Sequence, residues 1–278
     1  MKKLWILLIM GMILVTMGCS DQKASGESAS EAKESSNKLE RILADGKIVV
    51  GTSADYPPYE FHAMIDGKDE IVGFDIEIAK EIAKGLGVEL EIQDMSFDAV
   101  LAGVGSGMID IGVAGINPSP ERDEQMDFSE IYYSATHTIL VLADQKENYA
   151  SVEDLKGKTI GVQIGTIQEE LAKTQIEGAN VKSLGKVTDL VLELKTGLID
   201  VIILEGPVAN SYAMQNKDLS VVESVKFEQV DAGSSVITAN GEKELMAEIN
   251  KILQELKASG KVDLYVSEAT KLADEVQS

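Results

Sequence analysis

The chain has 278 residues, of which 44% are apolar and 26% charged, and these ordinary values exclude a disordered chain or a multi-span membrane protein. Its formal net charge of −22 opposes contact with a phosphate backbone, so we expect no nucleic-acid partner. The single cysteine excludes an intrachain disulfide and a thiolate metal cluster, and no HExxH, Walker A or GxSxG motif occurs. We therefore expect no metal and no cofactor.

The N-terminal segment has the pattern of an export signal. Two lysines precede an apolar run over residues 4–15, which is shorter than the roughly 20 residues that a membrane-spanning helix needs. Gly18 and Cys19 then resemble the lipobox of bacterial lipoproteins, in which the cysteine is lipidated and becomes the new N-terminus. Residues 1–18 are therefore predicted to be a lipoprotein signal peptide. Thr16 departs from the usual aliphatic residue of that motif, and an ordinary secretory signal is the alternative.

A polar spacer follows the predicted lipidation site. Between Cys19 and residue 38 no aliphatic side chain is larger than alanine, so this stretch cannot bury enough apolar surface to offset its ordering entropy. Residues 19–38 are predicted to be a disordered tether, and the globular body is expected to start near Leu39. An anchor, a spacer and a globular body together predict a protein that works just outside a membrane.

The first part of the body alternates strands and helices. Residues 47–51 form a short run rich in β-branched residues, typical of a buried strand. Apolar residues at helical spacing predict a helix over residues 73–86, and the alternation in residues 88–95 predicts a half-buried strand. A second helix is expected near residues 97–104, followed by a strand within 107–115.

The same order of elements returns later in the chain. Residues 158–162 predict a new first strand, and Thr166 is a candidate N-cap for a helix over 167–175. A helix near residues 189–195 then leads into a strand within 197–206. A last amphipathic helix is expected over residues 242–258.

Two strings support an internal repeat. GMIDIGVAG and GLIDVIILEG share a glycine, an apolar residue, Ile-Asp, a strand and a closing glycine. Alternating helices and short strands imply parallel βαβ units, so the repeat predicts two α/β lobes of similar plan. Ligands of such sheets bind beyond the carboxyl ends of the strands. Those ends correspond to residues 53–60, 115–122 and 163–168 and to Glu205, which we expect to line one cleft.

Two charged residues at the strand ends are candidates for ligand binding. Arg122 is one of only two arginines and could clamp a carboxylate with its bidentate fork, or could form a surface ion pair with Glu121, Asp123 or Glu124. Glu205 ends an apolar strand and could accept a hydrogen bond from an ammonium group. Alternatively, Glu205 is an N-cap or first-turn acid of the following helix.

Aromatic residues are concentrated at the first strand end. Residues 56–61 hold three of the 13 aromatics, and Phe97 is a fourth candidate wall for a ligand. The alternative is that Tyr59 and Phe61 serve only to anchor the loop to the core. We expect His62 in a loop and His137 in a crossover strand, and assign neither a chemical role.

GFDIEIAKEIAKGL, over residues 73–86, resembles the signature of bacterial extracellular solute-binding proteins of family 3, the polar amino-acid receptors of ABC importers. GTSADYPPYEF, AGINPSPER, LKGKTIGVQIGT and TGLIDVIILEGPVA resemble the family in the same order. The resemblance implies the two-lobed type II periplasmic-binding-protein fold, an α/β fold with mainly parallel sheets and a two-strand hinge. Lobe 1 would comprise residues 39–135 and 235–278, and residues 136–234 would form the hinge strands and lobe 2.

The resemblance also implies roles for single residues. The arginine at the Arg122 position grips the ligand α-carboxylate, assisted by backbone groups at Gly115 and Asn117 and by the N–H of Thr166. The acid at the Glu205 position, where relatives commonly have aspartate, receives the α-ammonium group. The full set of expected ligand-binding residues is Arg122, Glu205, Tyr56, Asn117, Gly115, Thr166, Phe97, Ser53, Asp55 and Gln163.

The side chain of the ligand is expected to be polar and cationic, as in arginine or lysine. Asp55, Glu60 and Asp98 lie in segments near the aromatic walls, and carboxylates with aromatic rings suit a cation. Some relatives that bind cationic amino acids have an aspartate where Ser53 stands, which counts against this choice. Glutamine or another neutral polar amino acid is the alternative, with amide contacts from Asn117.

The function implied is that of a substrate-binding component that delivers an amino acid to the membrane subunits of an ABC permease. We expect a monomer, lipid-anchored to the outer face of the cell membrane, with no enzymatic activity. One alternative is an enzyme similar to cyclohexadienyl dehydratase, with Glu205 as the general acid. Another is the input domain of a sensor, which would need a signalling partner.

Overall fold

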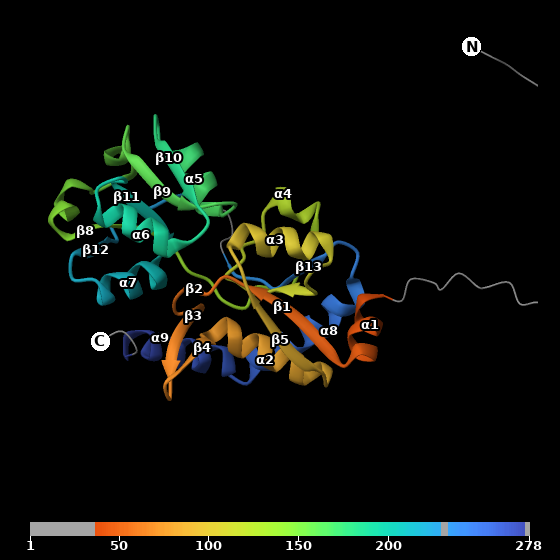
Figure 1. Cartoon of the computed structure of the whole chain (residues 1–278). Helices are drawn as coiled ribbons and strands as arrows, with labels where there is room; N and C mark the ends of the chain where they lie inside the picture. The colour runs from red at the N-terminus through yellow and green to blue at the C-terminus, as the bar shows by residue number, and fades with distance from the viewer. Residues whose placement is uncertain (1–36, 229–232, 276–278) are drawn as a thin grey trace, which may run out of the picture. The chain divides into compact units, whose positions relative to one another are not determined.

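The computed structural model describes residues 37–228 and 233–275, so the predicted signal peptide and Cys19 lie outside the described residues (Figure 1). The first described element is α1 (Lys38–Asp45), whose N-cap Asn37 accepts a hydrogen bond from the backbone N–H of Glu40 at 2.8 Å. Lys38 was expected to end the tether, yet it is a buried helical residue. The side-chain cap explains the difference, since it allows the helix to begin one residue earlier.

Five strands form the sheet of lobe 1. Its order is β5 (Glu89–Asp94), β1 (Lys47–Thr52), β6 (Ile111–Gly112), β13 (Ile237–Ala239) and β7 (Met126–Phe128). Strand β1 pairs in parallel with β5 and β6, whereas β13 is antiparallel to both of its neighbours. The parallel strands and their connecting helices confirm the βαβ prediction, although the strand expected within residues 107–115 contains only the two residues of β6.

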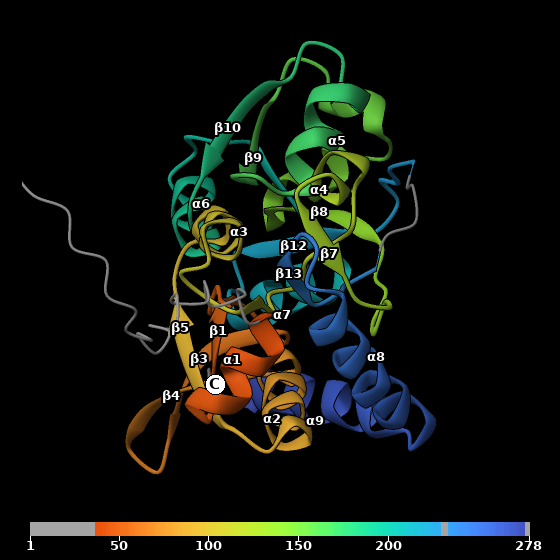
Figure 2. The same ribbon diagram turned by 90° about the vertical axis from the view of Figure 1, so that its right-hand side faces the viewer.

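The other helices of lobe 1 are α2 (Phe74–Leu86), α3 (Phe97–Ser106), the short α4 (Pro120–Asp123), α8 (Lys243–Ala258) and α9 (Lys261–Glu275). Three of them, α2, α3 and α8, match their predicted positions closely, whereas α4 and α9 were not predicted. Helix α2 buries an apolar stripe that includes Ile78 and Ile82, and it packs against α8 and α9 (Figure 2). Helix α9 was not predicted, because its buried face is narrow and made largely of Val262, Ala269 and Ala273.

Lobe 2 repeats this plan around its own sheet. The strand order is β10 (Asn180–Leu184), β9 (Thr159–Gln163), β11 (Val201–Glu205), β8 (His137–Leu142) and β12 (Leu219–Val222). The first three strands are mutually parallel, and β8 is antiparallel to β11 and β12. The helices α5 (Ile167–Gln175), α6 (Val187–Lys195) and α7 (Gly206–Gln215) accompany the sheet, with 3-10 turns η1 (Ala143–Asn148) and η2 (Val152–Leu155) after β8.

The Ile-Asp repeat has the same structural role in both lobes. Asp110 Oδ2 accepts the backbone N–H of Val49 at 2.9 Å, beside the first strand of lobe 1. Asp200 Oδ2 accepts the backbone N–H of Thr159 at 2.7 Å, at the start of the first strand of lobe 2. Each aspartate therefore binds the backbone of the first strand of its lobe, which supports the repeat seen in the sequence.

A small antiparallel sheet was not expected. It consists of β2 (Asp55–Tyr56), β3 (Glu60–Ile65) and β4 (Lys68–Val72). His62 lies in β3 rather than in the expected loop, and its ring contacts the carboxylate of Asp69 on β4 at 3.0 Å. The hairpin turn at Asp66 and Gly67, both with positive φ, was the signal in the sequence that would have revealed it.

The chain crosses between the lobes twice. In the described part of the crossings, Tyr133 pairs with Ser234, and the Ser234 N–H donates to the carbonyl of Tyr133 at 2.7 Å. The hinge strands expected at the two ends of residues 136–234 fall in these segments, of which residues 229–232 lie outside the described ranges. The lobe boundaries at residues 135 and 235 stay a prediction.

Candidate functional site

A narrow cavity lies where the carboxyl ends of β1, β6 and β9 meet, and residues of both lobes line it. The space open inside it is about 10 Å³, roughly the room of one water molecule. The lining residues are Ser53, Tyr56, Glu60, Phe97, Ala114, Gly115, Asn117, Gln163, Thr166 and Gln168. Seven of the ten residues expected to bind the ligand are therefore brought together here, as the geometry of parallel sheets predicts.

Glu205 of lobe 2 does not line the cavity but contacts Asn117 and Tyr56, which do. The residue is fully buried at the end of β11, and its carboxylate accepts hydrogen bonds from the Tyr59 hydroxyl and, at 3.4 Å, from the Asn117 amide of lobe 1. It is the N-cap of α7 by position, but its side chain makes no capping hydrogen bond. Burial raises the pKa of Glu205 to about 7, and the hydrogen bonds from Tyr59 and Asn117 oppose that rise. The N-cap alternative is therefore confirmed for the position of Glu205, although its carboxylate bonds to Tyr59 and Asn117 instead of to the first N–H groups of α7.

Arg122 lies beside the cavity, on α4. Ser119 caps this short helix, and the turn directs the guanidinium back toward lobe 1 and across to lobe 2. Its NH1 donates to the carbonyl of Asn117 at 2.6 Å, and its NH2 donates to the carbonyl of Gly165. The guanidinium carbon is 5.6 Å from the centre of the Phe97 ring, within range of a cation–π contact.

No ion pair involving Arg122 is present among the described residues, so the alternative of a surface salt bridge with its acidic neighbours is not supported. Two backbone carbonyls are instead its acceptors, and both are neutral. Burial lowers the pKa of Arg122, which means that its charge is incompletely compensated. An incoming carboxylate would be a stronger partner than either carbonyl.

Glu60, one of the acids expected near the aromatic walls, lines the cavity, and the buried Asp75 beside it was missed in the expected site. Glu60 is 1% exposed, and neither of its carboxylate oxygens accepts a hydrogen bond from a donor in the described residues. Asp75, on the first turn of α2, accepts the N–H of Gly115 at 2.7 Å and the Tyr132 hydroxyl at 2.9 Å. Burial raises the pKa of Asp75 to about 6, while burial and the neighbouring Asp75 raise the pKa of Glu60 well above its usual range.

Aromatic rings enclose these acids. Tyr56 and Tyr59 have ring centres 5.4 Å apart, and Tyr59 packs against Phe74 with centres 4.4 Å apart. Tyr59 is therefore both a core anchor and a site residue, since its hydroxyl reaches Glu205. Gln168, a second residue missed in the expected site, donates to the Tyr56 hydroxyl from α5 at 3.3 Å. The sequence could have indicated Gln168 as a site residue, because it lies on the first turn of the helix that Thr166 caps.

The polar residues of lobe 2 at the cavity are positioned by local structure. Thr166 is the N-cap of α5, as predicted, and its hydroxyl donates to the carbonyl of Gln163 at 2.7 Å. The Gln163 amide in turn donates to the carbonyl of Gly185 at 3.1 Å. These contacts hold the N-terminus of α5 against the cavity, where its N–H groups favour an anionic group.

Two of the expected acids lie outside the cavity. Asp98 is an exposed residue of α3. Asp55 is buried but does not line the cavity, because Ser53 and the backbone of α6 already occupy its two carboxylate oxygens. His137 lies in β8 as expected, and burial lowers its pKa to about 4.

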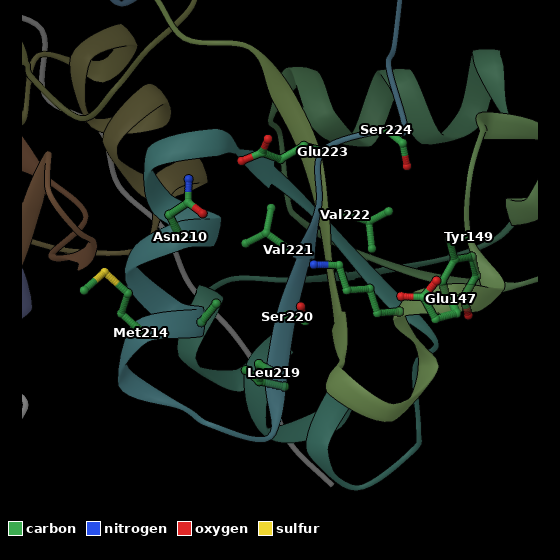
Figure 3. Close-up of a pocket in the computed structure, with 12 residues that line it drawn as sticks. Glu147, Tyr149, Asn210, Met214, Leu219, Ser220, Val221, Val222, Glu223 and Ser224 are labelled. Carbon is green, nitrogen blue, oxygen red and sulfur yellow. The ribbon is translucent and has the colours of Figure 1, made fainter.

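The described surface also has larger depressions, two of which have similar volumes. One, of about 650 Å³, adjoins the cavity at Arg122 and Thr166 and is lined by α3, α4 and α5. The other, also of about 650 Å³, lies over β12 and α7, and Figure 3 shows Tyr149, Met214 and Ser220 around it. None of the expected site residues lines this second groove, which is away from the strand ends.

Two sheets with this strand order, joined by two crossings and enclosing a cavity at the strand ends, define a two-lobed amino-acid-binding protein of the type II periplasmic class. The family model for bacterial extracellular solute-binding proteins, family 3, matches residues 48–268. The chain belongs to this family, which confirms the resemblance seen in the sequence and indicates an extracytoplasmic protein. In the described residues, no helix combines the length and apolar character needed to cross a membrane.

Individual relatives agree with this assignment. The chain is 37% identical to the arginine-binding extracellular protein ArtP of Bacillus subtilis, over 95% of this chain and 96% of that protein. It is similar to the amino-acid ABC transporter substrate-binding protein AbpA of Streptococcus pneumoniae bound to L-arginine, with a TM-score of 0.82 and 41% identity over 85% of this chain and 99% of that one. An ancestral amino-acid-binding protein, described as a precursor of cyclohexadienyl dehydratase, has a TM-score of 0.72 and 31% identity over 87% of this chain and 100% of that one.

Proposed function

We propose that this protein captures a cationic L-amino acid, arginine in the first place, between its two lobes and delivers it to an ABC permease. The observation that carries the choice of a cation is the buried Glu60, whose oxygens have no hydrogen-bond donor in the described residues and which faces a second acid, Asp75. Such a pair retains protons when no cation is near, because two adjacent buried carboxylates cannot both ionise at low cost. A guanidinium or ammonium group would replace those protons.

The other end of the ligand has partners of the required charge. Arg122 would exchange the carbonyl of Gly165 for the α-carboxylate, which the N-terminus of α5 at Thr166 also favours. Glu205 would receive the α-ammonium group on the opposite side, and Tyr56 would cover the aliphatic part of the ligand. The comparison proteins named for arginine support this choice independently of the cavity.

Calorimetry with a panel of amino acids at two salt concentrations tests the proposal. Arginine should bind, lysine should bind more weakly because it lacks the planar fork, and glutamine should bind weakest. Mass spectrometry of the compound released from the denatured purified protein would identify a co-purified ligand directly. Binding of glutamine without detectable binding of arginine, lysine or histidine would reject the cationic ligand and favour the amide-rich alternative of Asn117, Gln163 and Gln168.

An enzymatic role is the second candidate, and one observation favours it. The pKa of Glu205, about 7, is that of a group able to donate a proton near neutral pH. We propose that this shift serves ligand binding and that the protein has no catalytic activity. Turnover of a prephenate-type substrate by the purified protein, lost on substitution of Glu205 by glutamine, would contradict this.

We further propose that Cys19 is lipidated and holds a monomer at the outer face of the cell membrane, next to its permease. The short apolar run and Gly18 before the only cysteine support this, and two acyl chains suffice for stable attachment. Cys19→Ala should release the protein into the medium or leave it unprocessed. A variant that fractionates with membranes at the mature size would refute lipidation at this residue.

A further inference from the structure

Asp55 makes two contacts that join the two lobes and a third within lobe 1, and it does not itself line the cavity. Its Oδ2 accepts the backbone N–H of Val187, the first residue of α6, at 2.5 Å. Its carbonyl accepts the hydroxyl of Tyr212, on α7, at 2.7 Å. Its Oδ1 accepts the Ser53 hydroxyl at 3.0 Å, which links this contact to a residue that lines the cavity. All of these atoms are buried, since Asp55 and Tyr212 are each 6% exposed.

Helix α6 depends on this contact for its N-terminal hydrogen bonding. Its N-cap is Lys186, whose side chain makes no capping hydrogen bond. The first N–H groups of a helix need an outside acceptor, and the helix dipole favours an anionic one. Asp55 supplies that carboxylate from lobe 1, so the cap of a lobe 2 helix belongs to the other lobe. When the lobes separate, the N–H of Val187 must find water instead.

The N-cap residue itself adds an outer contact. Lys186 Nζ donates to Asp94 Oδ1 and to the carbonyl of Met95, both at 3.0 Å. The side chains of Lys186 and Asp94 are partly exposed, so their ion pair stabilises the contact between the lobes less than the buried hydrogen bonds of Asp55 do. Strand β2 packs directly against α6, beside these contacts (Figure 1).

We propose that Asp55, the N–H of Val187 and the Tyr212 hydroxyl form an interlobe latch that sets how long a ligand stays bound, and not which ligand binds. This inference rests on the proposed function as a receptor whose lobes close over an amino acid. Contacts that exist only in the closed arrangement add the same free energy to the binding of every ligand that closes the lobes. Asp55 and Tyr212 are therefore positioning residues, because neither meets the ligand.

The test removes one hydroxyl in each of two variants. Tyr212→Phe deletes a latch hydrogen bond without changing charge or the cavity lining. Tyr265→Phe is the matched control, because its hydroxyl donates to Glu81 within lobe 1 at 2.8 Å. Dissociation of arginine and of lysine is followed by stopped-flow fluorescence, and the unfolding midpoint of the ligand-free protein is measured alongside.

Tyr212→Phe should speed the dissociation of both amino acids by the same factor, about three- to tenfold, with the association rate unchanged within about twofold. Tyr265→Phe should leave dissociation unchanged. Asp55→Asn keeps an acceptor for the N–H of Val187 and should have a smaller effect than Asp55→Ala, a rescue that a general loss of packing would not produce.

Two results would overturn the latch. Unchanged dissociation in Tyr212→Phe, with the ligand-free protein destabilised instead, would mean that the contact is permanent and independent of closure. A change for arginine but not for lysine would make it a specificity contact. The wild-type titration distinguishes these failures from a failure of the proposed function: a wild-type protein that binds no amino acid would overturn both, whereas normal wild-type binding confines the failure to the latch.

Discussion

The protonation of Glu205 should make arginine binding depend on pH. If Glu205 receives the α-ammonium group, the bound form needs the ionised carboxylate, whereas burial between the closed lobes raises the pKa of Glu205 to about 7 when no ligand is present. A carboxyl group with that pKa is about one-tenth ionised at pH 6 and about nine-tenths ionised at pH 8. The affinity for arginine should therefore fall about tenfold from pH 8 to pH 6, or about 1.4 kcal/mol.

The acids on the opposite wall act in the same direction. The pKa values of Asp75 and Glu60 are both raised by burial, so a cationic side chain must also displace protons there at low pH. The tenfold change is consequently a lower bound. The guanidinium of arginine does not titrate in this range, and any loss of the α-ammonium proton toward pH 8 would weaken binding there, so a rise in affinity with pH belongs to the protein.

Titration calorimetry in two buffers of different ionisation enthalpy measures both quantities. The affinity should rise with pH, and at least about one proton per protein should be released on binding at pH 6. In Glu205→Gln the pH dependence should shrink by about tenfold, since the principal titrating group is gone. Equal affinity at pH 6 and pH 8, or tighter binding at pH 6, would refute the assignment of Glu205 to the ammonium group.

The stability of the ligand-free protein should change in the opposite sense. A carboxyl whose pKa is raised on folding, from 4.5 to about 7 for Glu205, favours the folded state at low pH. This contribution of Glu205 to the free energy of unfolding is complete below pH 4.5, the pKa of the group in the unfolded chain, and is lost as the pH rises through about 7. Thermal unfolding of the ligand-free and arginine-bound protein across this range should therefore show a ligand-induced shift that grows with pH.

Three substitutions test the remaining parts of the site and the fold. Arg122→Lys keeps the charge but loses the fork, and calorimetry should show binding at least about tenfold weaker in a protein that unfolds like the wild type; unchanged affinity would contradict the clamp. Glu60→Gln should stabilise the ligand-free protein in thermal unfolding, by removing a buried acid, and weaken arginine binding about tenfold or more while affecting glutamine less. Gly73→Ala should destabilise by about 2 kcal/mol or more in denaturant unfolding, because Gly73 has a φ of 128° and an added Cβ would lie 2.1 Å from the carbonyl oxygen of Tyr59. Gly105→Ala, in open space on α3, is its control and should be neutral or stabilising.

Local patterns predicted most of the elements because their causes are local. Helix α2 follows from apolar residues at helical spacing, and α5 from the Thr166 cap, which accepts the N–H of Glu169 at 3.3 Å. The position of Arg122 and Glu205 near one cavity follows from parallel strands whose carboxyl ends share an edge. The prediction weakened where partners are distant in sequence.

The acids show this limit clearly. Asp75 has the sequence appearance of a first-turn helix acid, and only the fold brings it beside Glu60 and the N–H of Gly115. Asp55 was expected at the ligand because it is next to Tyr56. Successive side chains on a strand point to opposite faces, and β2 contains only these two residues. Tyr56 faces the cavity, so the carboxylate of Asp55 faces α6 instead.

The distribution of charge between the lobes suggests an order of events for the proposed capture. Arg122, Glu60 and Tyr56 all belong to lobe 1, so the open lobe 1 holds partners for the carboxylate, the side-chain cation and the aliphatic part of an arginine. Lobe 2 contributes Glu205, the N-terminus of α5 and the helix that Asp55 caps. A ligand held by lobe 1 therefore neutralises the acids that would otherwise oppose closure, and closure then adds Glu205 and the latch at once. A ligand with a neutral side chain would leave the Glu60–Asp75 pair protonated. Closure of the lobes over such a ligand would therefore be less favourable in free energy.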